Sequence, residues 1–230
     1  MTLFREGHTD VHDPGQQLEN EVRRFQAWAR DHPEPEEERA PEWERDYEGW
    51  PALYAAFAAL VAAVPCQDWS QTIAEQVVSA MAHDSDQQGL TRELARHPDT
   101  LLCLAERACA LQEPNAKWQI ATELGKLDRS RPQAEPLLLR YTRDDDEYVR
   151  RRALLALADL GSGYAADPDV LERLWHSDVA WDEYGRMAVL YALWKIRSPQ
   201  LEHYLALADA DGRQRVAEYA ASVRAGAPHP

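Results

Sequence analysis

The chain has 230 residues, and 45% of them are hydrophobic, yet only three are Phe; Ala carries much of the share, which favours close-packed helices over strands. Lys and Arg number 25 against 40 Asp and Glu, which gives a formal net charge of -15 at pH 7. This charge disfavours nucleic acid as a ligand, because a nucleic-acid surface needs a basic footprint, and it favours a basic protein partner. No apolar run reaches the ~18 residues of a membrane span, so we expect no membrane partner and a cytoplasmic protein.

The first residues are polar and show no periodicity, so we expect a flexible N-terminal segment over 1–17. Within it, the stretch HTDVHD at 8–13 offers side chains that a metal accepts. No helix or strand is expected to orient these side chains, and no metal site is assigned. A single domain is predicted to follow over 18–226, starting with an amphipathic helix from Leu18 to Ala29, and residues 227–230 form a tail.

Residues 31–50, DHPEPEEERAPEWERDYEGW, form an acidic, Pro-rich loop with nine acidic side chains and two Arg between Asp31 and Glu48. Aromatic anchors framed by charge are typical of protein-binding hot spots, which makes this loop a candidate partner site. The same aromatics could equally pin the loop onto the first helices, and both interpretations stay open. The candidate contacts here are Glu36, Glu37, Glu38, Glu42, Trp43, Glu44 and Tyr47.

Apolar periodicity, with Pro near helix starts and Gly near helix ends, predicts roughly twelve helices in all. The segments expected after the loop are 51–64, 68–82, 89–96, 100–111, 114–127, 134–141, 147–160, 170–175, 183–196 and a hairpin over 198–224. Cys66, Cys103 and Cys109 lie in these apolar stretches. Because an odd count is a poor disulfide framework, we expect three reduced thiols.

Two of these segments are copies of each other. EYVRRRALLALADL at 147–160 and EYGRMAVLYALWKI at 183–196 share six residues in fourteen at one offset of 36. PNAKWQIATELGKL at 114–127 is a weaker copy, 33 residues upstream. Each copy follows a shorter apolar segment, so the repeating unit is a helical hairpin. Such hairpins bury their apolar faces by stacking, which predicts a solenoid.

These copies resemble HEAT-type repeats, which place an acidic residue before a Val-Arg pair, then spaced Ala and Leu, then a Gly after the second helix. Val149, Arg150 and Gly161 fit that pattern. The second copy departs from it, with Gly185 where Val is expected, and the third has Lys117 in place of the Arg. The resemblance implies an all-α fold, a right-handed α-solenoid of about six stacked antiparallel helix hairpins, and the short repeats are closer to the compact bacterial variety.

Acidic residues and tyrosines gather where the second helices are expected to start. Asp146 with Arg150, and Asp182 with Arg186, are spaced as i,i+4 acid-base pairs, which favours a structural ladder over ligand binding. Neighbouring side chains form the second group of candidate partner contacts, namely Asp144, Asp145, Tyr148, Asp182 and Tyr184.

The sequence contains no His-Glu-x-x-His, paired Cys-x-x-Cys, phosphate-binding Gly-rich loop or Gly-x-Ser-x-Gly pattern, so we expect neither an enzyme nor a cofactor. The favoured hypothesis is a non-catalytic protein-binding scaffold for a basic partner, in its specific form a bacterial immunity protein that neutralises a toxic effector domain. The alternative is a ligand-binding enzyme similar to the helical-repeat DNA glycosylases, which use Trp, Asp and Arg on a concave surface. Trp118, Trp181 and Trp194 would serve it, although the net charge stands against it.

Overall fold

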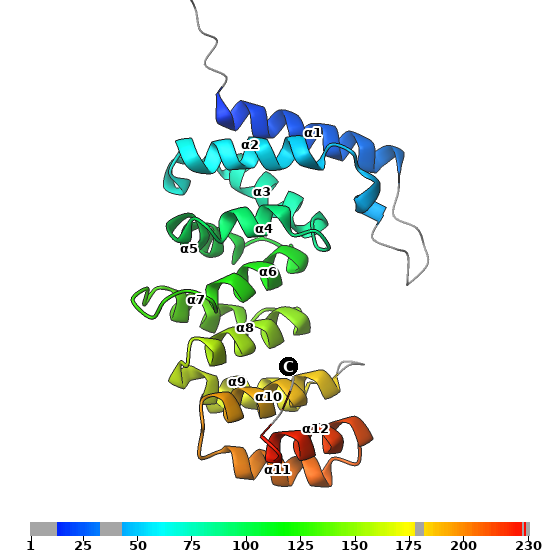
Figure 1. The fold of residues 1–230 in the computed structure, drawn as a ribbon, viewed down its shortest axis with the longest axis vertical. Helices are drawn as coiled ribbons and strands as arrows, with labels where there is room; N and C mark the ends of the chain where they lie inside the picture. Colours follow the sequence, from blue (N-terminus) through cyan, green and yellow to red (C-terminus); the bar gives the residue numbers. More distant parts are fainter. Residues whose placement is uncertain (1–12, 33–42, 178–181, 227, 229–230) are drawn as a thin grey trace, which may run out of the picture.

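The computed structural model describes residues 13–32, 43–177, 182–226 and 228. Within these ranges the chain forms twelve α-helices and three short 3-10 helices, without a strand (Figure 1). The predicted all-α fold and the predicted number of helices are therefore confirmed for the described part of the chain. Several sequence predictions fall outside these ranges, namely those for 1–12, Glu36, Glu37, Glu38, Glu42, Trp181 and most of the tail.

The N-terminal unit is irregular and contains the first four helices: α1 (Pro14–Asp31), α2 (Trp50–Ala63), α3 (Gln71–His83) and α4 (Gly89–Leu94). Helix α1 packs against both α2 and α3, and α4 packs against α2. Helix α1 begins four residues before the predicted Leu18, because the Asp13 side chain accepts a hydrogen bond from the N–H of Gly15 (3.0 Å) and caps the helix start.

Four regular hairpins follow: α5 (Pro98–Ala108) with α6 (Pro114–Leu124), α7 (Ala134–Tyr141) with α8 (Glu147–Asp159), α9 (Pro168–Trp175) with α10 (Asp182–Lys195), and α11 (Leu201–Ala210) with α12 (Gln214–Arg224). The second helices α6, α8, α10 and α12 pack side by side, and α3 continues this row next to α6. We call it the second-helix row. Figure 1 shows the resulting column, an α-solenoid.

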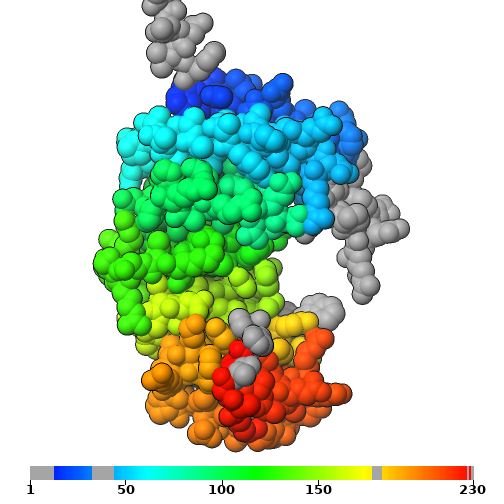
Figure 2. Space-filling model, viewed as in Figure 1, coloured from blue at the N-terminus to red at the C-terminus, as the bar shows by residue number. Residues whose placement is uncertain are grey.

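About six hairpins with atypical end units were expected, and in the described part of the chain four hairpins are regular, while the first four helices form an irregular unit. Helix α4 has only six residues, and α1 packs across two helices, so the first four helices do not repeat the unit of the later ones. Terminal units of solenoids are commonly atypical, because one of their faces must meet solvent instead of a neighbouring repeat. In Figure 2 the column is hollowed on one side, between the blue segment around residue 45 and the yellow start of α10.

The core runs through the whole described column, from Leu18 to Val223. Small residues let neighbouring helices approach closely. At Gly125, at the end of α6, an added Cβ would lie 2.7 Å from the Cα of Ala156 in α8. Small residues such as Gly125 and Ala156 therefore allow the tight helix packing that is expected for a solenoid.

A disulfide links Cys66 to Cys103, whose Cα atoms are 6.1 Å apart. It ties the 3-10 helix η2 (Cys66–Asp68) to α5. The prediction of three reduced thiols is thus wrong for this pair, while Cys109 is free. The two cysteines are 37 residues apart, which is close to one repeat length, so the stacking of the helices brings them together. The number of cysteines alone does not reveal this proximity.

Candidate partner-binding surface

The second-helix row carries a chain of alternating aromatic and arginine side chains. We call it the aromatic-arginine ladder, and its members are Trp118 on α6, Tyr148, Arg151 and Arg152 on α8, Tyr184 on α10 and Arg215 on α12. Because these four helices lie side by side, the ladder runs across the second helices of four consecutive hairpins.

Each guanidinium in the ladder lies over an aromatic ring. The Arg152 guanidinium carbon is 5.7 Å from the centre of the Trp118 ring and 5.9 Å from that of Tyr148. The Arg151 carbon is 4.6 Å from Tyr148 and 5.2 Å from Tyr184, and that of Arg215 is 5.3 Å from Tyr184. All of these distances are within the ~6 Å range of cation–π attraction. The ladder is therefore connected from α6 to α12.

Hydrogen bonds hold the arginines in place. Arg151 Nε donates to Glu147 Oε1 (3.0 Å), and Arg152 Nη2 donates to Thr122 Oγ1 (2.9 Å). Arg215 Nη1 donates to Glu183 Oε1 and to the Tyr184 hydroxyl, both at 2.7 Å. Carboxylates thus offset the charge of two of the three guanidinium groups. A surface that is fixed before binding loses less side-chain entropy when a partner docks.

The ladder is also accessible. Tyr148 is 37% exposed, and among the described residues only Tyr148 and Tyr164 are exposed large hydrophobic side chains. A small pocket of about 140 Å³ opens next to the ladder, lined in part by Thr122, Arg152 and Tyr191. Trp, Tyr and Arg are the residues enriched in binding hot spots, and such anchors pair with small, well-packed pockets. The ladder thus consists of the residue types that protein-binding hot spots use.

Sequence reasoning found part of this ladder and missed the rest. The internal repeat sets Tyr148 and Tyr184 at equivalent positions of α8 and α10, and both were predicted as partner contacts. It missed the arginines. The signal for Arg151 and Arg152 was available, because residues three and four positions apart are neighbours on a helix surface. Arg215 could not be found this way, since it comes from another hairpin.

Asp144, predicted as a partner contact, instead has a structural role. Its Oδ2 accepts a hydrogen bond from Lys117 Nζ at 2.7 Å, and both side chains are largely buried. Its Oδ1 accepts from the N–H of Asp146 (3.0 Å). Buried charges need such pairing, so this carboxylate is committed to the stack of hairpins. Asp145 is exposed, and the Asp182 side chain lies outside the described part of the chain.

The arginines of the repeat pattern donate to backbone carbonyl oxygens of neighbouring segments. Arg150 Nη1 donates to the carbonyl oxygens of Asp144 (2.8 Å) and Asp145 (2.7 Å). Arg186 Nε donates to the Trp175 carbonyl (2.9 Å), and its Nη1 donates to Asp211 in the next hairpin (2.5 Å). For Arg150 these contacts take the place of the predicted pair with Asp146, and its role remains structural. The predicted pair of Arg186 involves the Asp182 side chain, which lies outside the described part of the chain.

The described end of the acidic loop is fastened to the N-terminal unit. Tyr47 is buried, with its ring centre 5.2 Å from that of Phe25, 5.4 Å from Trp28 and 5.7 Å from Trp50. Burial raises the pKa of the Tyr47 hydroxyl. Tyr47 is therefore packed into the N-terminal unit, as the pinning interpretation expects.

Glu44 belongs to the same docked segment, within the 3-10 helix η1 (Trp43–Asp46). Its carbonyl oxygen accepts from Trp50 Nε1 (2.7 Å), and its carboxylate lies 3.3 Å from His83 Nδ1. The Trp43 side chain lies outside the described residues. The described end of the loop is thus fixed to the N-terminal unit.

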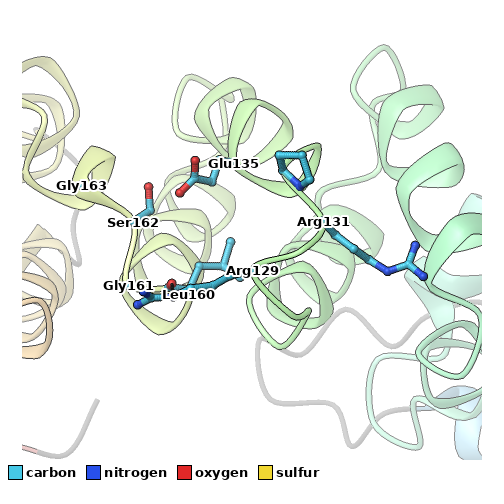
Figure 3. A pocket seen from close by; sticks show the side chains of 8 residues that line it. Arg129, Arg131, Glu135, Leu160, Gly161, Ser162 and Gly163 are labelled. Atoms are coloured by element: carbon cyan, nitrogen blue, oxygen red, sulfur yellow. Dashed lines mark hydrogen bonds between the residues drawn. The ribbon is translucent and has the colours of Figure 1, made fainter.

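A second concavity, shown in Figure 3, lies where the loop before α7 meets the end of α8 and encloses about 180 Å³. Arg129 Nε donates to the Leu160 carbonyl there (2.8 Å). Arg131 turns away from Gly161 in Figure 3 and pairs with Asp99 on α5. Both arginines therefore serve to join neighbouring hairpins.

Two of the three tryptophans singled out for an enzyme lie in the described part of the second-helix row. Trp118 is part of the ladder, while Trp194 is half-buried on α10 with its ring centre 5.8 Å from that of Tyr191. Among the described residues, no group of three or more His, Cys, Asp or Glu side chains is placed to hold a metal ion. Asp13 of the HTDVHD stretch caps α1.

A family model for HEAT repeats matches residues 103–194, which run from α5 into α10 and include every ladder residue except Arg215. Residues 103–194 are HEAT repeats. No curated protein and no solved structure matches the chain. HEAT repeats generally stack into extended surfaces that bind other proteins. None of the described helices is long and apolar enough to cross a membrane.

Proposed function

We propose that this protein is a non-catalytic scaffold that binds a basic protein partner along the second-helix row. The aromatic-arginine ladder carries this proposal. It combines the three residue types most enriched in binding hot spots, and it is held rigid by its own ion pairs and ring contacts. A continuous face across stacked repeats is suited to a large partner surface more than to a small ligand.

The charge of the chain supports a basic partner. The formal net charge is -15, and nine acidic side chains against two Arg lie between residues 31 and 48. The described end of this loop, η1, is fixed to the N-terminal unit. Complementary charge accelerates encounter and disfavours wrong partners, so such a surface selects for positive proteins.

In its specific form, the proposal is that the protein is an immunity protein covering a toxic effector domain. A small acidic solenoid is well suited to this role, because toxic domains that act on nucleic acid carry basic surfaces. Expressing the partner alone should then stop growth of a bacterial host, and co-expression of this chain should restore growth. A partner that is harmless by itself would refute this form while leaving the scaffold proposal intact.

The proposal is tested by capture followed by calorimetry. The tagged full chain is used to isolate partners at low and moderate salt, and the bound protein is purified and titrated. We expect one basic protein, bound stoichiometrically, with affinity that decreases as salt rises. Replacing Glu36, Glu37, Glu38 and Glu44 by Lys should weaken binding and flatten its salt dependence. A neutral or acidic partner, or co-purifying nucleic acid alone, would contradict the proposal.

A further inference from the structure

The Cys66–Cys103 disulfide borders a pocket that lies on the first-helix side of the solenoid. This pocket has a volume of about 490 Å³, lies between α5 and α7, and is lined in part by Cys103, Leu102 and Leu137. Its size falls in the range of ~300–1,000 Å³ typical of small-molecule sites. The pocket lies away from the ladder, because its walls come from first helices and from the loops next to them.

The two sulfurs of this disulfide differ in accessibility. Cys103 is half-buried and contributes to the pocket wall, whereas Cys66 is 1% exposed and is not part of that wall. Which sulfur of a disulfide is attacked depends on access by the incoming thiolate. A thiolate in the pocket therefore meets Cys103, and Cys66 is the leaving group.

We propose that the Cys66–Cys103 disulfide is a thiol-exchange site, at which a low-molecular-weight thiol enters this pocket and becomes attached to Cys103. The thiolate sulfur forms a new S–S bond to Cys103 Sγ as the bond to Cys66 Sγ breaks. Cys66 leaves as a thiolate and takes a proton from water. The incoming thiol is the co-reactant, and no other oxidant or reductant takes part in the step.

The lining of the pocket suits a peptide-like thiol. Gln67 and Gln133 offer amide groups, and Arg140 and Asp99 offer charges of both signs, around an apolar wall that includes Leu102. Arg140 is paired with Glu106, but both side chains are largely exposed, and exposed pairs exchange partners at little cost. The amide and charged groups of a small peptide thiol can form hydrogen bonds and ion pairs with these side chains at the rim of the pocket.

The remaining cysteine, Cys109, does not compete with the disulfide for thiol exchange. Cys109 is half-buried, and its Sγ donates to the Ala105 carbonyl at 3.3 Å. Burial raises the pKa of the Cys109 thiol, so little of its reactive thiolate forms. Exchange is thus directed to the disulfide.

Exchange would loosen a defined junction. The disulfide ties η2, in the N-terminal unit, to α5, where the HEAT-repeat part of the chain begins. Arg107 on α5 also donates to the carbonyls of Trp69 (2.8 Å) and Ser70 (3.4 Å), so the two parts remain joined without the disulfide. If the chain works in a reducing compartment, a redox-responsive role is the usual one for a disulfide there.

The test uses the purified full chain and reduced glutathione as the probe. Free thiols are alkylated before and after exposure, and each cysteine is assigned by peptide mass spectrometry. We expect neither Cys66 nor Cys103 to alkylate beforehand, and glutathione to appear on Cys103 with Cys66 newly alkylated. The proposal is overturned if all three cysteines alkylate at the start, or if the adduct forms on Cys66.

A pair of variants tests entry through the pocket. Gln133→Trp places a bulky side chain on the exposed rim of the pocket and should slow adduct formation several-fold. Gln112→Trp, exposed and outside the pocket lining, is the matched control and should leave the rate unchanged. Equal rates for the two variants would contradict access through this pocket. Cys109→Ser should give the same adduct as the unmodified chain.

Discussion

At the scale of single residues, Gly161 shows how local backbone geometry and packing act together. It ends α8 with a φ of +64°, in the left-handed region that favours glycine. The N–H of Ser162 then donates to the Leu157 carbonyl (2.9 Å), which closes the helix end. The space that a side chain would occupy is filled by Arg129, whose Nη2 lies 1.9 Å from the position of an added Cβ.

We predict that Gly161→Ala destabilises the protein by about 1–2 kcal/mol from the left-handed backbone alone. Displacing Arg129 also weakens its bond to the Leu160 carbonyl and adds to the loss. Urea unfolding measures the change. Gly163→Ala is the matched control, because nothing lies within 4 Å of its added Cβ, and it should be nearly neutral. Equal stability of the two variants would contradict this account.

The residues of the candidate site could be predicted only in part. Tyr148 and Tyr184 were visible because they repeat at a fixed offset, and Gly161 because a helix end favours glycine. Tyr47 looked like an anchor for a partner, yet it is buried on Phe25. Whether an aromatic side chain near charges meets a partner or its own core depends on tertiary packing, which one sequence does not reveal.

At the scale of elements, α8 illustrates why the HEAT-repeat helices start where they do. The Asp146 side chain accepts a hydrogen bond from the N–H of Val149 (3.0 Å), which satisfies one of the free donors of the first turn. The acidic residue before the Val-Arg pair is thus an N-cap. This start fixes the register of Tyr148, Arg151 and Arg152, and therefore of the ladder.

We expect Asp146→Ala to cost about 1 kcal/mol of stability, the usual value for a lost N-cap. Asp145→Ala removes a neighbouring exposed carboxylate and serves as the control, with a change within roughly 0.5 kcal/mol. Chemical denaturation of both variants gives the comparison. If Asp145→Ala proved the more costly of the two, the capping role of Asp146 would be refuted.

Helices were predictable wherever the apolar periodicity agreed with the positions of Pro and Gly at the helix ends. Helix α7 spans the predicted residues 134–141, and α6, α8 and α10 differ from their predicted ranges only at their ends. The start of α3 was misplaced, because Ser70 and not Asp68 provides the cap. The packing of α1 and α4 depends on contacts between segments that are distant in the sequence, and so does the disulfide. The local sequence pattern therefore could not predict either feature.

At the scale of the whole molecule, several buried tyrosines couple stability to alkaline pH. Burial raises the pKa of Tyr54, Tyr141 and Tyr219 above their ordinary value, and it raises the pKa of Tyr204 to about 12. The folded chain holds these protons more tightly than the unfolded chain, whose tyrosines titrate near 10. Above that pH the unfolded state binds fewer protons, so the free energy of unfolding falls as pH rises.

Thermal unfolding should therefore shift to lower temperature between about pH 10 and 12. The stability from these tyrosines is fully present below about pH 10 and is lost as pH rises toward their folded pKa values. Tyr204→Phe keeps the ring but removes one titrating group, and the slope of Tm against pH should become shallower. A Tm that does not change over this range would contradict the burial of these hydroxyl groups.

The central claim for the molecule is that the ladder on the second-helix row binds the partner, and two exposed tyrosines test it most directly. Tyr148 lies in the ladder near the start of α8, whereas Tyr164 is 48% exposed in the 3-10 helix η3 (Gly163–Ala166), beyond the other end of α8. Calorimetry with the captured partner should show Kd raised about tenfold or more by Tyr148→Ala and left nearly unchanged by Tyr164→Ala. Equal affinities of the two variants would show that the partner binds elsewhere.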